Sequence, residues 1–113
     1  MRRWLVSDAV VANDGSTLSW SNPKHRGYAY PEAAGLLLST LSTTPDISAE
    51  SRVVADRVAG WLCRSIGTDG GVGRDGITYL FDSSVALAGL LRYRAAGGRE
   101  GGDEAIHHLG TFV

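Results

Sequence analysis

Two short stretches of the chain place aromatic rings and carboxylates immediately before apolar segments. Their candidate functional residues are Tyr28, Tyr30, Glu32, Asp75, Tyr79 and Asp82. Sugar-binding clefts use the same groups, because aromatic faces stack on pyranose rings while carboxylates accept hydroxyl protons or act as general acid and base. This combination makes a carbohydrate-like ligand the first chemical hypothesis.

Each of the acidic residues also has a structural explanation. Glu32 sits where the positive end of a helix dipole favours a carboxylate, and Asp82 can cap the helix that follows it. Asp75 precedes a glycine, and such a pair favours a tight turn. Structural roles therefore compete with functional roles at all three positions.

Aromatic and histidine residues elsewhere give weaker signals. Trp20, with His25 and Arg26 nearby, either forms a sugar platform or an anion contact, or pins a loop to the domain. The adjacent His107 and His108 would point about 100° apart on a helix, so they cannot chelate one metal as an i, i+4 pair would. We expect no metal site.

Two further features are interpreted as structural. Cys63 follows a tryptophan and a leucine on the dry side of its helix, which indicates a small core residue. The segment 71–76 matches Gly-x-Gly-x-x-Gly, but no strand is predicted before it, which argues against a dinucleotide cradle. We expect no bound cofactor.

The elements that position these residues can be predicted from apolar spacing and turn residues. Residues 4–12 are predicted to form a helix, although Val10 and Val11 favour a strand. Residues 13–27 are rich in Asn, Asp, Gly, Ser and Pro and are predicted to form an ordered loop. Pro31 opens a helix that is apolar nearly all round and should be buried.

An amphipathic helix is predicted next, with Asp46 or Ser48 as its cap and Gly67 as its C′ residue. Its apolar positions are Ile47, Val54, Val58, Trp61, Leu62 and Ile66. Its wet face holds Glu50, Arg52, Asp56, Arg57 and Arg64. One dry face and one wet face make it an outer helix.

A second ordered loop is predicted over residues 67–79, with a small hairpin at 72–78, because its Asp-Gly pairs favour positive φ and tight turns. Asp82 or Ser83 then caps a helix over 84–94 that is apolar on almost every side. This helix is the second that should be buried.

The last part of the chain contains a glycine-rich break and a further helix. The break spans 97–103, and a more polar helix is predicted over 104–113. The sequence stops at Val113 without a polar or glycine terminator, whereas natural C-termini are normally solvated or tied down. We therefore expect the chain to be part of a longer protein or to assemble with others.

Composition bounds the classes of function. A chain of 113 residues and 12.0 kDa forms one domain at most, and 43% apolar content with 20% charged residues excludes a disordered tail. The formal net charge of -1 gives no field that attracts nucleic acid. Apolar runs are too short for a signal peptide or for the roughly 20 residues that span a bilayer. We expect a cytoplasmic protein with no membrane partner.

The loops before the two buried helices carry a resemblance to a known group. The helices are predicted to begin 51 positions apart, at Pro31 and Asp82, which is typical of a helical-hairpin repeat. The segments 27–35 (GYAYPEAAG) and 69–82 (DGGVGRDGITYLFD) resemble the loop-to-inner-helix junctions of α/α-toroid proteins. This group includes six-hairpin glycosidase-like proteins and terpenoid-cyclase or prenyltransferase-like proteins. The resemblance covers about residues 20–95.

The resemblance implies a fold and a site. The fold would be all-α, built of antiparallel helical hairpins as a partial α/α toroid with Gly-rich loops, and a carbohydrate-like substrate would lie in a central cavity. The implied catalytic residues are Glu32 and Asp82. The implied substrate-binding residues are Trp20, Tyr28, Tyr30, Asp75 and Tyr79.

A full toroid needs more hairpins than this chain supplies, so the resemblance implies an N-terminal part that is not catalytic alone. The remaining hairpins of a longer chain, or a protein partner, would complete the pocket. Two alternatives stay open. One is an isoprenoid cyclase or prenyltransferase-like scaffold, and the other is a small non-catalytic helical module that oligomerises or docks on a partner protein.

Overall fold

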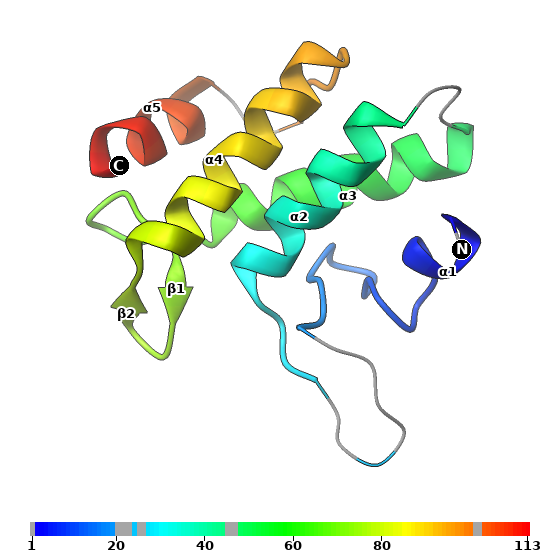
Figure 1. Cartoon of the computed structure of the whole chain (residues 1–113), viewed down its shortest axis with the longest axis horizontal. Helices are drawn as coiled ribbons and strands as arrows, with labels where there is room; N and C mark the ends of the chain where they lie inside the picture. Colours follow the sequence, from blue (N-terminus) through cyan, green and yellow to red (C-terminus); the bar gives the residue numbers. More distant parts are fainter. Residues whose placement is uncertain (1, 20–23, 25–26, 45–47, 101–102) are drawn as a thin grey trace.

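The computed structural model describes residues 2–19, 24, 27–44, 48–100 and 103–113. This part is mostly helical (Figure 1). The elements are α1 (Arg2–Leu5), α2 (Pro31–Thr43), α3 (Ala49–Arg64), β1 (Gly73–Arg74), β2 (Ile77–Thr78), α4 (Leu80–Ala95) and α5 (Asp103–Phe112). The chain extends 36 × 34 × 20 Å, so it is about two helices thick. The predicted helical fold class is confirmed.

Helices α2 and α4 lie side by side and run parallel (Figure 1). Near their N-termini Tyr30 bonds to Asp82, 52 positions further on, and near their C-termini Arg92 bonds to Ser39, 53 positions back. A nearly constant offset along both helices is possible only when the two run in the same direction. Helix α3 packs mainly on α2, and α5 packs on α4. The described helices therefore form two hairpins, α2–α3 and α4–α5.

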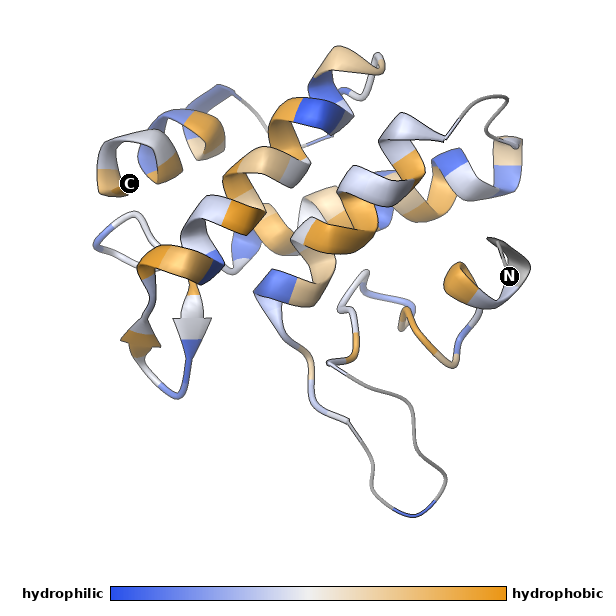
Figure 2. Ribbon diagram, viewed as in Figure 1, coloured by the Kyte–Doolittle hydropathy of each residue, from blue (hydrophilic) through white to orange (hydrophobic). Residues whose placement is uncertain are grey.

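The core lies between these helices and is built from their aliphatic faces (Figure 2). Its most deeply buried large side chains are Val11, Leu38, Leu41, Val58, Leu62, Val72 and Leu109. The amphipathic character predicted for α3 is confirmed, because Val58 and Leu62 are buried while Glu50 and Arg64 are exposed.

Helices α2 and α4 are less buried than predicted. Leu36 on α2 is 52% exposed, and on α4 Phe81 is 67% and Leu91 48% exposed. These two helices are apolar nearly all round, but the described chain supplies neighbours for only part of each circumference. Large apolar side chains on both helices therefore face outward.

The N-terminal segment differs from its prediction. The helix ends at Leu5, and Val11 forms an isolated antiparallel bridge with Thr17, while Leu18 pairs with Ala29. The helix predicted over residues 4–12 was wrong, because the chain turns after Leu5 with the Val10 and Val11 N–H groups donating to the Ser7 carbonyl, and Val11 then pairs with Thr17. These bridges order the described parts of the loop 13–27.

The helix ends follow only some of the predicted caps. The Ser48 side chain accepts a hydrogen bond from the Ser51 backbone N–H, as predicted, whereas Asp46 and Ile47 lie outside the described residues. Gly67 is not the C′ residue, because α3 ends at Arg64 with Ser65 as its C-cap.

The hairpin predicted at 72–78 is confirmed as β1 and β2, which pair Gly73 with Thr78 and Arg74 with Ile77. Helix α4 then starts earlier than predicted and has no side-chain cap. Asp82 and Ser83 therefore lie inside its first turn and do not cap it. The Asp82 carboxylate instead accepts a hydrogen bond from Tyr30, and the Ser83 hydroxyl bonds to the backbone of Val72. Helix α5 agrees with the prediction for 104–113 to within one residue at each end.

Candidate functional site

The N-terminal ends of α2 and α4 meet through two of the predicted site residues. The Tyr30 hydroxyl donates to the Asp82 carboxylate at 2.5 Å, and Asp82 is only 5% exposed. This hydrogen bond, together with burial, raises the pKa of Tyr30 to about 12. The pair therefore joins the two helices and holds its proton on the tyrosine.

An aromatic cluster continues from this pair onto the hairpin. The rings of Tyr28 and Tyr30 meet edge to face with centroids 5.7 Å apart. The guanidinium carbon of Arg74 lies 3.5 Å from the centroid of the Tyr28 ring, which is cation–π geometry, and its Nε is 3.4 Å from the Asp75 carboxylate. Arg74 was not predicted as a site residue, because nothing in the sequence shows that β1 brings it to Tyr28.

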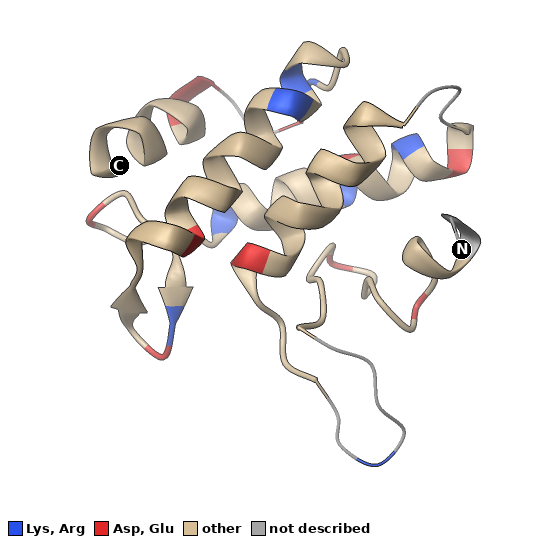
Figure 3. Cartoon of the chain, in the orientation of Figure 1, with Lys and Arg blue, Asp and Glu red and all other residues tan. Residues whose placement is uncertain are grey.

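The other predicted residues occupy the edge of this region. Glu32 lies half-buried in the first turn of α2, and Tyr79 precedes α4 with 43% of its surface exposed. Asp75 is the first residue of the Asp-Gly turn between β1 and β2, with φ of 54°. Trp20, His25 and Arg26 lie outside the described residues. Figure 3 shows an acidic residue near the N-terminal end of both α2 and α4.

These positions suit binding better than proton transfer. The Asp82 carboxylate is buried and already accepts the Tyr30 hydroxyl, whereas a general acid or base must reach a substrate proton. Tyr28 and Tyr79 keep surface that a ligand can contact. The catalytic roles of Glu32 and Asp82 stay predictions, and the geometry gives Asp82 a helix-positioning role.

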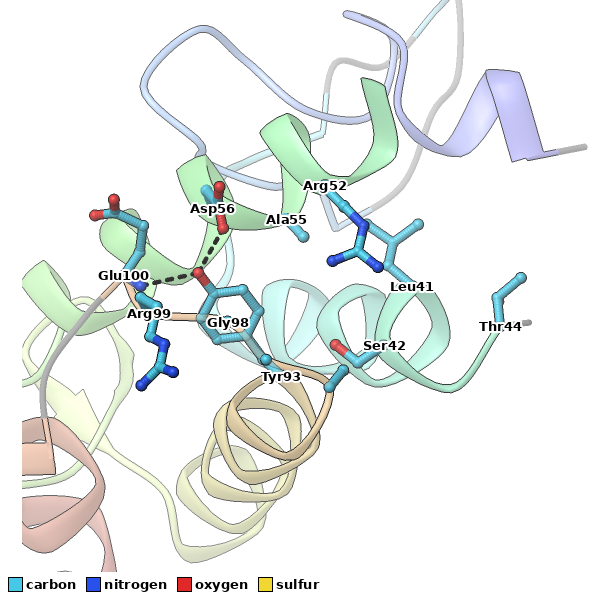
Figure 4. Close-up of a pocket in the computed structure, with 12 residues that line it drawn as sticks. Leu41, Ser42, Thr44, Arg52, Ala55, Asp56, Tyr93, Gly98, Arg99 and Glu100 are labelled. Atoms are coloured by element: carbon cyan, nitrogen blue, oxygen red, sulfur yellow. Dashed lines mark hydrogen bonds between the residues drawn. The ribbon is translucent and has the colours of Figure 1, made fainter. Parts of the chain in front are cut away.

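A cavity of about 610 Å³ opens at the opposite end of the same helices (Figure 4). It lies between the C-terminal ends of α2 and α4 and the first half of α3. Its lining residues are Leu41, Ser42, Thr44, Arg52, Ala55, Asp56, Tyr93, Ala96, Gly97, Gly98, Arg99 and Glu100. Its volume is in the range of small-molecule sites.

A buried tyrosine organises one wall of this cavity. Tyr93 is 4% exposed, and its hydroxyl donates to Asp56 at 2.6 Å while it accepts the Glu100 backbone N–H at 2.9 Å. Burial, followed by the bond to Asp56, raises the pKa of Tyr93 to about 12. The sequence offered one signal for this site, since a tyrosine within an apolar helix needs a partner for its hydroxyl.

The cysteine and the glycine-rich segment that the sequence analysis singled out both lie in surroundings that explain them structurally. Cys63 is half-buried beside the core, and burial raises the pKa of its thiol. The Gly-x-Gly-x-x-Gly segment 71–76 leads into and forms the β1–β2 hairpin rather than a strand-to-helix turn. Within the described ranges, no three His, Cys, Asp or Glu side chains converge as a metal site would require.

Among the helices that the structure describes, none combines the length and apolar character needed to cross a bilayer. Comparison of the chain with protein-family models, curated protein sequences and solved structures finds no significant match.

Proposed function

We propose that this chain supplies two helical hairpins of a larger α/α array of the toroid type, with α2 and α4 as inner helices and α3 and α5 as outer helices. The observation that carries the proposal is the parallel packing of α2 and α4 at a nearly constant offset of 52 to 53 residues. Consecutive hairpins in an α/α array stack with their equivalent helices parallel, and each contacts its neighbours.

The exposed apolar side chains support the same proposal. Leu36 on α2, and Phe81 and Leu91 on α4, leave large apolar surfaces open to solvent. Burial of such surface contributes about 25 cal/mol per Å², so further hairpins packed on α2 and α4 would stabilise the array. On the outer helix α3, Val53 is the exposed counterpart, at 58%.

The ligand that we propose for this array is carbohydrate-like and lies at the N-terminal ends of α2 and α4. Tyr79 offers exposed ring surface for stacking there. Arg74, which the Tyr28 ring holds in place, and Glu32 supply a donor and an acceptor for hydroxyl groups. Asp82 would hold Tyr30 in place rather than act on the substrate. Processing of the ligand would require groups from further hairpins.

Association of the chain tests the array. Light scattering should show that the 113-residue chain self-associates, because a second copy covers the exposed apolar side chains of α2 and α4 in place of further hairpins. The double variant Leu36→Asp/Leu91→Asp should be monomeric with unchanged helix content by circular dichroism. Val53→Asp on α3 is the matched control and should leave association intact. A monomeric parent chain, or equal loss of association in Val53→Asp, would contradict the proposal.

A non-catalytic interaction module is the second candidate, and the same exposed residues favour it. Titration of the chain with neutral oligosaccharides, followed by amide NMR shifts, separates the two. A carbohydrate-binding array predicts shifts confined to residues 27–32 and 73–82, lost in Tyr28→Ala and kept in Trp4→Ala, an exposed aromatic on α1. Self-association without any such shift would favour the module.

A further inference from the structure

We propose that the cavity at the C-terminal ends of α2 and α4 binds a small organic carboxylate, with Arg52 as its anchor. This site is at the other end of the helices from the aromatic cluster, and its ligand does not depend on the array proposed above. The cavity has a volume of about 610 Å³, which is larger than the volume of a few water molecules and is in the range of small-molecule sites.

Arg52 carries an unused guanidinium into this cavity. Its side chain extends from α3 over the cavity toward α2, where Leu41 and Ser42 lie (Figure 4). Among the described residues, neither the Arg52 guanidinium nor the Ser42 hydroxyl has a hydrogen-bond or ion-pair partner. Two donors that lack partners thus line one side of the cavity.

The carboxylate four residues along the same helix does not form an ion pair with Arg52. Asp56 lies one turn further along α3, at the i+4 position that ordinarily pairs with an arginine. Its carboxylate is held instead by the Tyr93 hydroxyl at 2.6 Å, and no Arg52–Asp56 ion pair forms. The buried Tyr93 therefore keeps Arg52 available to an external anion.

The rest of the lining suits the body of such a ligand. Leu41, Ala55 and Ala96 supply apolar surface, and the edge of the Tyr93 ring adds aromatic surface. Arg99 and Glu100 balance one another in charge at the cavity edge. A planar guanidinium donates two parallel N–H···O bonds to a carboxylate. A carboxylate that carries a small apolar group therefore contacts both the charged side and the apolar side of the cavity.

Phenylacetate and its neutral analogue phenylacetamide are the probes that test the site. In NMR titrations of the full chain, phenylacetate should shift amides at 41–44, 52–56 and 93–100, and phenylacetamide should bind at least about tenfold more weakly. The variant Arg52→Gln should weaken phenylacetate binding by a similar factor. Ser42→Ala should weaken it by a smaller factor.

Arg64→Gln, an exposed arginine at the C-terminal end of α3 that does not line the cavity, is the matched control and should leave phenylacetate binding unchanged. Arg52 is exposed on the wet face of α3, so its glutamine variant is expected to fold, which circular dichroism checks. Equal affinity for the acid and the amide, equal binding by Arg52→Gln, or shifts outside the cavity would overturn the proposal.

Discussion

Gly35 of α2 and Gly89 of α4 bring the backbones of the two parallel helices into direct contact. A Cβ atom at Gly89 would lie 2.4 Å from the Gly35 carbonyl oxygen, and one at Gly35 would lie 2.7 Å from the Val85 carbonyl oxygen. Real Cβ atoms essentially never approach backbone this closely, and backbone cannot rotate away as a side chain can. The packing of α2 on α4 therefore depends on the absence of a side chain at both positions.

Alanine at either glycine should destabilise the chain, although alanine is the better helix former. The propensity gain is about 1 kcal/mol, whereas forcing the helices apart costs about 1–3 kcal/mol and also exposes core surface. We expect Gly35→Ala and Gly89→Ala to lower the free energy of unfolding in urea by about 1–2 kcal/mol each. The double variant should lose less than the sum, because one separation of the helices relieves both clashes.

Gly110→Ala is the control for this prediction. Gly110 also lies within a helix, but nothing lies within 4 Å of where its Cβ would be. This substitution should stabilise the chain by up to about 1 kcal/mol. If Gly89→Ala stabilises as much as Gly110→Ala does, α2 and α4 do not pack backbone to backbone.

Removal of the Tyr30 hydroxyl should cost stability, because the Asp82 carboxylate would stay buried without its donor. We expect Tyr30→Phe to lower the free energy of unfolding by about 1–3 kcal/mol. A double-mutant cycle with Asp82→Asn should show coupling between the two residues, whereas a cycle of Tyr30→Phe with the exposed Asp75→Asn should show none. Additive losses for Tyr30 and Asp82 would mean that their contact does not join α2 to α4.

The positions of α2, α3 and α5 were predictable because they follow local periodicity. The apolar run after Pro31 and the alternating faces around Val58 and Leu62 repeat every three or four residues, so each helix can be recognised within its own segment. The β1–β2 hairpin was predictable for the same local reason, because the turn at 75–76 is an Asp-Gly pair.

Long-range partners were not predictable from such patterns. Asp82 has the residue type and position of a helix cap, and only the approach of Tyr30 from 52 residues away gives it another role. Tyr93 and Asp56 likewise meet across 37 residues. The aromatic cluster was therefore predicted in part, whereas the cavity beside Tyr93 was missed, since its walls come from three helices and a loop.

Stability should fall as the pH rises through the alkaline range. The folded chain raises the pKa of Tyr93 and of Tyr30 to about 12, from an ordinary value of 10.0. Between these values the folded state holds protons that the unfolded state has released, so the stabilisation is fully present below about pH 10 and is lost as the pH rises toward 12. Urea unfolding between about pH 9 and pH 12 should show this decline.

The tyrosine variants identify the source of that decline. Tyr93→Phe should be less stable at neutral pH but show a shallower loss above about pH 10, because one of the two groups no longer titrates. Gly110→Ala changes no titratable group and should keep the parent slope. An unchanged slope in Tyr93→Phe would show that the Asp56 contact does not hold the proton.

In the turn between β1 and β2, backbone conformation rather than room for a side chain should limit which residue can occupy position 76. Gly76 has φ of 79°, and nothing lies within 4 Å of where its Cβ would be. Alanine there meets no clash but must adopt the left-handed region, so Gly76→Ala should lower the free energy of unfolding by about 1–2 kcal/mol. Gly76→Asn should lose less, because asparagine tolerates this region better. Equal losses for alanine and asparagine would show that side-chain volume, not backbone strain, limits position 76.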